Sequence, residues 1–394
     1  MTELDALLVL NAVAGVGNIR VRKLVEQYGS AHKLFSLDEA ELRENGVPQP
    51  AVQNILNFPR DNFLKNEYNL ITQKKVKLVD YRDESYPVNL RGIPDAPIVL
   101  YVRGSILKDN EASIAIVGSR RCSLYGSSVS GQFAGRLAEL GFCVVSGLAR
   151  GIDTAAHQGA LKAKGQTQAV MGCGLAQIYP PENKNLFEEI SEKGAVISEF
   201  SMETPPAPYN FPRRNRVISG LSWGVVVVEA ALRSGALITA DCALEQGRDV
   251  FAVPGKVDNP GSWGAHNLIK QGAKLVSSVE DILEELELPL TRFLEERKAR
   301  AGQDIPQDKE LPNLMPSNPF VTSAAHGNCL EALPSEGELT EEENAVYRHL
   351  SDSPVHVDEL SLRCARPAAF IGSVLLQLEL KRVVKQLPGK LFVK

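Results

Sequence analysis

The chain has 394 residues, of which 44% are hydrophobic, and a formal net charge of −5. This length allows two or three domains, and the negative charge means that nucleic-acid binding would have to rest on a local basic patch. Without an apolar run of about 18 residues or the basic start of a signal peptide, the sequence predicts a cytoplasmic protein with no membrane segment. Six scattered cysteines with no zinc-like spacing predict no metal site. We also expect no cofactor.

Residues 1–72 are predicted to form a small helical domain. Helical patterns flank the triplet Gly15-Val16-Gly17, which is typical of a helix-hairpin-helix module. Such a hairpin can present backbone N–H groups to a phosphate. An ordinary turn between two helices fits the same residues, so both interpretations stay open.

Residues 73–288 alternate between strand-like and helical patterns. This alternation is typical of right-handed βαβ units. It predicts an α/β fold with an extended Rossmann-like, doubly wound and mostly parallel sheet of about nine strands, more than the six of a minimal dinucleotide-binding fold. The expected strands are 76–81, 97–102, 114–117, 142–146, 167–171, 195–200, 224–228, 250–253 and 273–276.

The first βα unit of this alternation carries the clearest sign of an anion site. Ser113–Val117 reads as a buried strand, Gly118 turns the chain, and a helical pattern follows from Tyr125. A glycine turn in this position aims backbone N–H groups at anions, and Arg120 and Arg121 add two positive charges. The stretch lacks both G-x-G-x-x-G and the P-loop pattern, so it predicts an anion site but not NAD or ATP.

Cations recur in the loops that follow other strands of the predicted sheet. Open α/β sheets bind ligands beyond the carboxyl ends of their strands, so these loops should lie at one edge. Aromatic residues accompany the cations, a combination that fits single-stranded nucleic acid bound without sequence preference. Acids are also present, and core filling remains an equal explanation for Phe211. The candidate residues are Gly118, Ser119, Arg120, Arg121, Asn183, Lys184, Phe211, Arg213, Arg214 and Arg216.

No catalytic set emerges from the sequence. Asp153 and His157 lie four residues apart on one helix face, a spacing that could hold a metal or shuttle a proton. One carboxylate and one histidine make an incomplete metal site, so we expect Asp153 to cap its helix and His157 to pack against the sheet. The amides of 234–239 could cradle a phosphate.

Residues 289–394 separate into a predicted linker, 289–337, and a predicted winged-helix domain, 338–394. Three helical patterns, at 340–350, 357–364 and 367–380, precede a hairpin pattern. The would-be recognition helix carries no charge over 367–378, whereas phosphate and base-edge contacts need donors. We therefore expect a protein-contact or structural role for this domain rather than DNA binding.

The motifs of the central domain, taken together, resemble the DNA processing protein A (DprA/Smf) family. The resemblance implies a core that binds single-stranded DNA, forms a homodimer and loads the RecA recombinase during natural transformation of competent cells. It places DNA contacts on Gly118, Ser119, Arg120 with Arg121, and Lys184. We expect dimerisation at the sheet edge near 273–276. The matching stretches are 116–120, 146–157, 179–183, 211–220, 234–237 and 253–255.

Two alternatives remain. The core also resembles nucleoside-monophosphate phosphoribohydrolases, which carry Pro-Gly-Gly-x-Gly-Thr-x-x-Glu. Aligned on Thr239, this chain has Cys242 in place of the glutamate, so we expect no hydrolysis, although a nucleotide could still bind. A winged-helix regulator with an accessory sheet domain is a third possibility, and the uncharged third helix counts against it.

Overall fold

The computed structural model describes residues 1–106, 112–286, 340–350, 355–364, 366, 368–380, 384–387 and 391–393. Two compact units make up the chain, Met1–Phe320 and Val321–Lys394. The predicted linker, 289–337, lies outside the described residues, and the predicted boundaries of the four domains stay predictions. None of the helices in the described ranges is long and apolar enough to cross a membrane.

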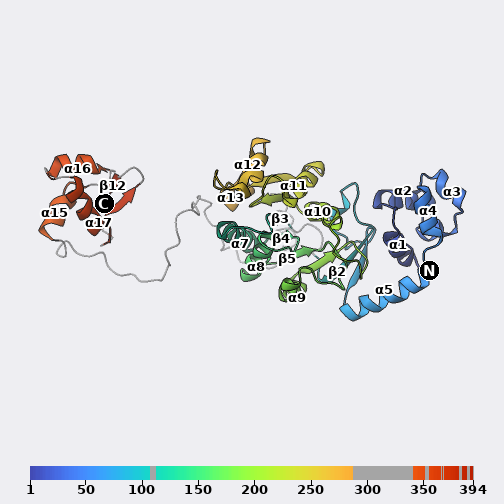
Figure 1. The fold of residues 1–394 in the computed structure, drawn as a ribbon. Helices are drawn as coiled ribbons and strands as arrows, with labels where there is room; N and C mark the ends of the chain where they lie inside the picture. The colour runs from blue at the N-terminus through green and yellow to red at the C-terminus, as the bar shows by residue number, and fades with distance from the viewer. Residues whose placement is uncertain are drawn as a thin grey trace, which may run out of the picture. The chain divides into compact units, whose positions relative to one another are not determined.

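All nine predicted strands of the first unit are present, and they form one sheet (Figure 1). The sheet has the order β1-β2-β6-β5-β4-β3-β7-β8-β9, with β2 antiparallel to both β1 and β6 and all other pairs parallel. The predicted fold class is therefore confirmed. The strands are β1 Lys77–Asp80, β2 Val99–Gly104, β3 Ser113–Val117, β4 Cys143–Ser146, β5 Thr167–Val170, β6 Ala195–Ser198, β7 Gly224–Val227, β8 Asp249–Ala252 and β9 Lys274–Leu275.

The strand order fixes where a ligand site can form. The six strands β5-β4-β3-β7-β8-β9 follow the 3-2-1-4-5-6 order of the dinucleotide-binding fold, and β6, β2 and β1 extend the sheet beyond β5. From β3 the chain adds β4 and β5 on one side, and from β7 it adds β8 and β9 on the other, so the direction of winding reverses between β3 and β7. A crevice at the carboxyl ends of these two strands is the expected binding position.

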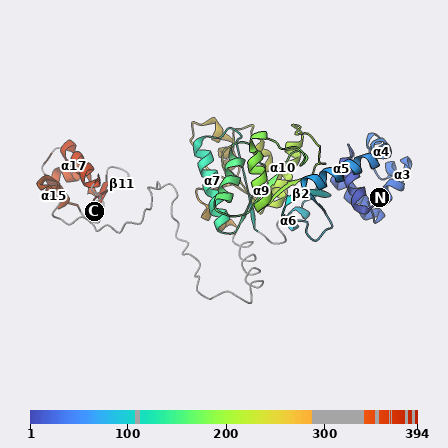
Figure 2. The ribbon, with the colours of Figure 1, turned by 90° about the horizontal axis from the view of Figure 1, so that it is seen from below.

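Strand β3 shows why the sheet carries helices on both faces. All five of its residues are buried, and alternate side chains point to opposite faces. Ile114 and Ile116 join the cluster under α7 and α8, whereas Ala115 and Val117 join the cluster under α10, α11 and α12. Figure 1 shows α7 and α8 on one side of the strands and α11 and α12 on the other, and Figure 2 looks onto the layer that contains α7. The helices of this part are α6 Val88–Arg91, α7 Leu124–Glu139, α8 Ile152–Lys162, α9 Lys184–Lys193, α10 Asn210–Leu221, α11 Gly235–Glu245, α12 Trp263–Lys270 and α13 Val279–Glu285.

The N-terminal residues are helical, as predicted. Gly15, in the turn between α1 and α2, has φ +86°, a conformation that favours glycine. The turn packs on α4, since a Cβ at Gly15 would lie 3.2 Å from the Cβ of Ala51. Contact of this turn with DNA stays a prediction. The helices are α1 Glu3–Ala12, α2 Asn18–Tyr28, η1 His32–Ser36, α3 Glu39–Glu44, α4 Gln49–Leu56 and α5 Arg60–Lys74.

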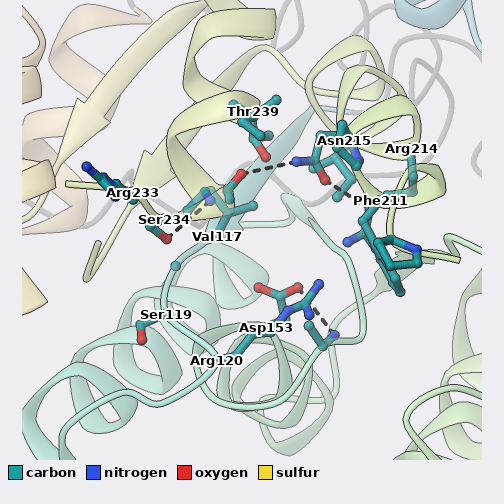
Figure 3. Close-up of a pocket in the computed structure, with 18 of the residues that line it drawn as sticks. Val117, Ser119, Arg120, Asp153, Phe211, Arg214, Asn215, Arg233, Ser234 and Thr239 are labelled. Atoms are coloured by element: carbon teal, nitrogen blue, oxygen red, sulfur yellow. Dashed lines mark hydrogen bonds between the residues drawn. The ribbon is translucent and has the colours of Figure 1, made fainter. Parts of the chain in front are cut away.

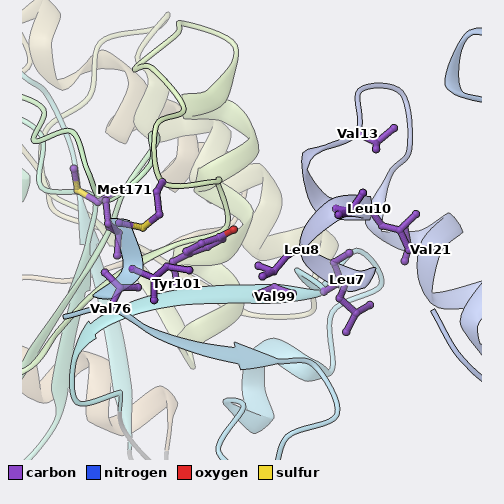
Figure 4. Packing of buried hydrophobic residues seen from close by; sticks show 14 of the residues in the cluster. Leu7, Leu8, Leu10, Val13, Val21, Val76, Val99, Tyr101 and Met171 are labelled. Carbon is purple, nitrogen blue, oxygen red and sulfur yellow. The ribbon is translucent and has the colours of Figure 1, made fainter. Parts of the chain in front are cut away.

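These helices share a hydrophobic core with the sheet. Leu7 and Leu8 of α1 belong to the same buried cluster as Val99 and Tyr101 of β2 (Figure 4). The side chain of Asn11 adds a hydrogen bond of 2.8 Å to the carbonyl oxygen of Glu199, just after β6. The N-terminal helices therefore support the antiparallel end of the sheet and the loop that follows β6.

The second unit has the three helices and the hairpin that the sequence predicts. A short strand that the sequence does not reveal, β10, pairs with β12 and completes a three-stranded antiparallel sheet. Leu360 of α16 and Ile371, Leu375 and Leu378 of α17 are buried in its core. The elements are α15 Glu341–Tyr347, β10 Val355–His356, α16 Val357–Cys364, α17 Ala368–Leu380, β11 Lys385–Leu387 and β12 Leu391–Val393.

A buried carboxylate joins α5 to the sheet. Glu67 accepts hydrogen bonds from the hydroxyl of Tyr101 at 2.7 Å and from the backbone N–H of Met202 at 2.9 Å. Burial raises the pKa of Glu67, and the charge of Glu203 adds to this effect, while the two hydrogen bonds oppose it. Ionisation of Glu67 therefore costs more in the folded state than in the unfolded state.

This arrangement predicts that the difference in the free energy of unfolding between the unmodified protein and Glu67→Gln depends on pH. A group whose pKa is raised by folding loses its stabilising contribution as the pH rises. The free energy of unfolding of the unmodified protein should therefore fall relative to that of Glu67→Gln as the pH rises above the ordinary value of 4.5. Denaturant titrations at several pH values measure this difference, and a difference that is constant across them would contradict the prediction.

Candidate nucleic-acid interface

A cavity of about 700 Å³ lies at the point where the winding of the sheet reverses. Its walls come from the loops after β3 and β7, from the start of α8 and from the start of α10. Figure 3 shows Ser119 and Arg120 on one side, Ser234 and Thr239 across from them, and Phe211 on a third side. The cavity therefore occupies the position that the strand order predicts for a ligand.

The loop after β3 relies on close backbone packing. A Cβ at Gly118 would lie 2.6 Å from Cγ1 of Ile152, so only glycine fits without displacement. The N–H of Ser119 donates to the carbonyl oxygen of Glu229 at 2.6 Å, and the N–H of Arg121 donates to Oγ of Ser119 at 3.1 Å. Two of the amides that we expected to face an anion are therefore already paired, which leaves that role to the exposed side chains of Arg120 and Arg121.

The N-terminus of α7 already holds a negative charge from the protein itself. The backbone N–H and the hydroxyl of Ser123 both lie 3.0 Å from Oε2 of Glu229. A Cβ at Gly126 would collide with the same oxygen, so glycine leaves room for it. The carboxylate complements the positive end of the helix. In dinucleotide-binding folds a pyrophosphate takes this position, so the side chain of Glu229 fills it here.

Phe211 forms an aromatic wall of the cavity. The guanidinium carbon of Arg120 lies 4.9 Å from the ring centroid of Phe211, and that of Arg214 lies 5.8 Å from it. The ring of Tyr179 is 5.7 Å away, centroid to centroid. Cation–π contacts of this kind hold a guanidinium near a ring face. Phe211 therefore orients Arg120 at the cavity, and Arg214 and Tyr179 hold the ring of Phe211 in place.

Arg214 is a structural cation beneath the cavity. It is buried, and its Nη1 donates to the carbonyl oxygens of Gly147, at 2.7 Å, and Val170, at 2.6 Å. These two bonds join the loop after β4 to the end of β5. Burial lowers the pKa of Arg214 to about 10, so the guanidinium stays charged at neutral pH. The side chain therefore ties strand ends together from the floor of the site.

We expected Asp153 to cap α8, but the structure shows that it holds the preceding loop instead. The N-cap residue of α8 is Gly151. Oδ2 of Asp153 accepts from the N–H groups of Gly147 at 3.2 Å and Ala149 at 3.3 Å. Burial raises the pKa of Asp153, while the charge of Arg214 and these hydrogen bonds oppose that shift. The carboxyl group therefore orders the loop after β4.

His157 packs against the sheet, as expected. Its Nδ1 lies 2.7 Å from Oγ1 of Thr167 on β5. That hydroxyl donates to the carbonyl oxygen of Val144 at 2.6 Å, so Nδ1 of His157 is the donor of the pair. Burial lowers the pKa of His157 to about 3, so the ring is neutral.

Asn183 and Lys184 have different environments. Asn183 is buried, and its Nδ2 donates to the carbonyl oxygen of Leu148 and to Oγ1 of Thr154, both at 2.9 Å. Lys184 is the first residue of α9, is exposed, and forms no ion pair with the residues that the structure describes. Asn183 therefore fixes the loop, and Lys184 is available at its surface.

The arginines of α10 also divide into exposed and paired side chains. Arg213 is exposed, with its guanidinium carbon 5.2 Å from the ring centroid of Phe200. Arg216 is only 11% exposed and forms ion pairs with Glu199 and with Asp95, where Nε lies 3.1 Å from Oδ2. Neither residue lines the cavity. Arg213 lies beside Phe211 and Pro212 in the chain, whereas the charge of Arg216 is already compensated.

Sequence reasoning misses one cation of the site, Arg233. It is exposed and lines the cavity from the loop after β7. The rule that locates Arg120 after β3 also applies to this loop, so the signal is present in the sequence. Ser234 follows it as the N-cap of α11, with Oγ accepting from the N–H of Ala236 at 3.3 Å. Cys242, which aligns with the hydrolase glutamate, does not line the cavity.

Comparison with known proteins gives consistent matches along the chain. Residues 77–287 match the family described as DNA recombination-mediator protein A, and residues 331–390 match the DprA winged helix domain. The chain is 39% identical to protein Smf of Escherichia coli K12, over 91% of this chain and 87% of that protein. It is 42% identical to DNA processing protein DprA of Streptococcus pneumoniae, over 70% of this chain and 95% of that protein.

A solved structure agrees with these matches. The X-ray structure of DNA processing protein A from Streptococcus pneumoniae superposes with a TM-score of 0.63 and 38% identity, covering 72% of this chain and 98% of that one. The sequence matches and the structural match therefore point to the same family. The chain belongs to the DNA recombination-mediator protein A family, whose members bear the names DprA and Smf.

Proposed function

We propose that this protein binds single-stranded DNA, without sequence preference, through cations on the carboxyl-edge loops of its sheet. The observation that carries the proposal is the convergence of exposed guanidinium groups on one cavity, Arg120 and Arg121 from the loop after β3 and Arg233 from the loop after β7. Phe211 and Tyr179 add aromatic faces to the wall. Cationic grooves with aromatic surfaces are typical of proteins that bind single strands.

The environments of the candidate residues divide them into two roles. The contact residues in this proposal are Arg120, Arg121, Lys184, Arg213 and Arg233, because their charged groups are exposed. The residues that hold the loops in place are Gly118, Ser119, Asn183, Arg214 and Arg216, because their polar groups are engaged or their backbone is closely packed.

The proposed role extends to recombination. The family description "recombination-mediator" and the relatives named DNA processing protein support the proposal that the bound strand is passed to the RecA recombinase during natural transformation. We propose that the protein does this in the cytoplasm and as a homodimer. Strand β9 lies at the sheet edge, and its Leu275 is 47% exposed, which supports pairing there.

We further propose that the protein leaves the DNA chemically unchanged. Asp153 is the sole acid among the described residues that line the cavity, and its carboxyl group is buried and held by two backbone N–H groups. General acid–base catalysis needs a group that can reach the reacting atom. The alternative of a bound nucleotide is disfavoured because Glu229 takes the phosphate position at the start of α7.

The contact residues predict a change in the salt dependence of binding. For single strands, each neutralised phosphate contributes about −0.7 to the slope of log affinity against log salt concentration. The double variant Arg120→Ala, Lys184→Ala should bind all sequences more weakly and with a flatter slope, measured by gel shift or anisotropy with oligo-dT. Arg136→Ala is the control, because this arginine of α7 is already paired with Glu139 of α7 and Glu280 of α13. Unchanged affinity of the double variant at moderate salt would refute the proposed contacts.

The winged-helix domain should contribute little to the affinity for single strands. Deletion of residues 338–394 is expected to leave the dissociation constant for oligo-dT within about twofold, because each contact residue lies in the first unit and phosphate contacts dominate such affinity. A binding titration of the shortened chain measures this. A loss of tenfold or more would show that the domain contacts DNA.

The proposed dimer predicts a sensitive position at the sheet edge. Leu275→Asp should convert a dimer into a monomer, because it places a charge on an exposed apolar edge that pairing would bury. Light scattering at micromolar concentration measures the mass of both proteins. Only monomer in the unmodified protein would contradict the proposal of a homodimer.

A further inference from the structure

A second surface, next to the cavity, has the properties of a strand-binding surface. We call it the β8 rim and define it by Tyr125, Lys256, Val257 and Trp263. Tyr125 is 41%, Val257 84% and Trp263 44% exposed. Exposed apolar side chains that lie next to one another, with polar residues around them, mark surfaces that contact a partner. The rim lies at the carboxyl end of β8, the same edge of the sheet as the cavity.

The aromatic rings of the β8 rim are fixed by hydrogen bonds. Nε1 of Trp263 donates to the carbonyl oxygen of Val257 at 3.0 Å, and the hydroxyl of Tyr125 lies 3.1 Å from the carbonyl oxygen of Pro254. Both bonds use the polar edge of the ring and tie it to the loop after β8. A ring held in place in this way loses little freedom when another flat group stacks on it.

The β8 rim adjoins the cavity through the start of α12. The N–H of Gly264, next to Trp263, donates to the carbonyl oxygen of Ala230 at 2.7 Å. A Cβ at Gly264 would lie 2.6 Å from the carbonyl oxygen of Ala231, a residue that lines the cavity. The loop that carries Arg233 is thus in direct contact with the helix that begins at Trp263.

The charges around the β8 rim suit a polyanion. Lys256 is exposed within it, and Arg121 and Arg233 are exposed and line the neighbouring cavity. None of these three cations forms an ion pair with a described residue. Asp258 is the exposed acid of the loop after β8, so these three cations outnumber it. This charge complementarity selects a nucleic-acid strand over an uncharged apolar partner.

We propose that a bound single strand continues from the cavity across the loop after β7 and onto the β8 rim, where bases stack on Trp263 and Tyr125. The proposal rests on the proposed function, and it adds the direction of the strand and two stacking residues. A strand too short to extend beyond the cavity would make no contact with Trp263. Base–aromatic stacking is tolerant of sequence, since every base has a flat face.

The fluorescence of Trp263 provides a direct test. The chain contains two tryptophans. Trp223 is half-buried, directly before β7 at the opposite edge of the sheet, with its ring edge-on to Phe142 at 6.2 Å. Trp223→Phe therefore leaves Trp263 as the single reporter, and Trp263→Phe leaves Trp223 as the matched control. Binding is followed independently by the anisotropy of dye-labelled oligo-dT.

The expected result depends on strand length. With oligo-dT of about 16 and about 4 nucleotides, the ends of the range of single-strand site sizes, the longer strand should quench Trp263 strongly at saturation and the shorter should quench it little. The Trp263→Phe protein should bind both without quenching. Trp263→Ala should weaken binding of the longer strand by about fivefold or more, with no change for the shorter one. Leu244→Ala, which removes an exposed apolar side chain from the outer end of α11, should change neither.

The possible outcomes separate this inference from the proposed function. Saturable anisotropy with no quenching of Trp263 by the longer strand would overturn the path across the β8 rim and leave single-strand binding intact. Equal quenching by both lengths would also overturn the path, because it would place Trp263 at the cavity itself. No binding by either measurement would overturn the proposed function together with the inference.

Discussion

The carboxylate of Glu229 determines what this version of the nucleotide-binding fold can hold. It accepts two hydrogen bonds from Ser123 at the start of α7, while its backbone carbonyl accepts from Ser119. Its Oε1 also faces Gly261, where a Cβ would lie 2.8 Å away. One residue thus joins the loops after β3, β7 and β8. Because it fills the phosphate position at the helix N-terminus, an anionic ligand must be held by side chains at the rim of the sheet.

The cations of the site have correspondingly different tasks. The buried guanidinium of Arg214 joins the ends of two strands, and the side chain of Arg216 neutralises Glu199, the residue to which Asn11 and Asn18 of the N-terminal helices donate. The exposed guanidinium groups of Arg120 and Arg233 face the cavity from either side of the point where winding reverses. Buried or paired cations therefore stabilise this edge of the sheet, and the exposed cations are the ones that we propose contact DNA.

The sequence allows the fold to be predicted well, because buried parallel strands are short apolar runs and the helices between them fix the topology. The site is harder to predict. Arg213, Arg214 and Arg216 are neighbours in the sequence, but a helix turns each of them in a different direction, and the face of α10 that meets the sheet depends on tertiary packing. The role of Glu229 is equally hidden, because its partners, Ser123, Gly126 and Gly261, come from distant segments. Strand β10 has two residues, too few for a pattern.

A structure of the protein with bound oligo-dT would test the central claim most directly. The account predicts phosphates beside the guanidinium groups of Arg120 and Arg233, with the carboxylate of Glu229 still bonded to Ser123 and the DNA backbone intact. A phosphate bound to the backbone at the start of α7, with the side chain of Glu229 displaced, would contradict it.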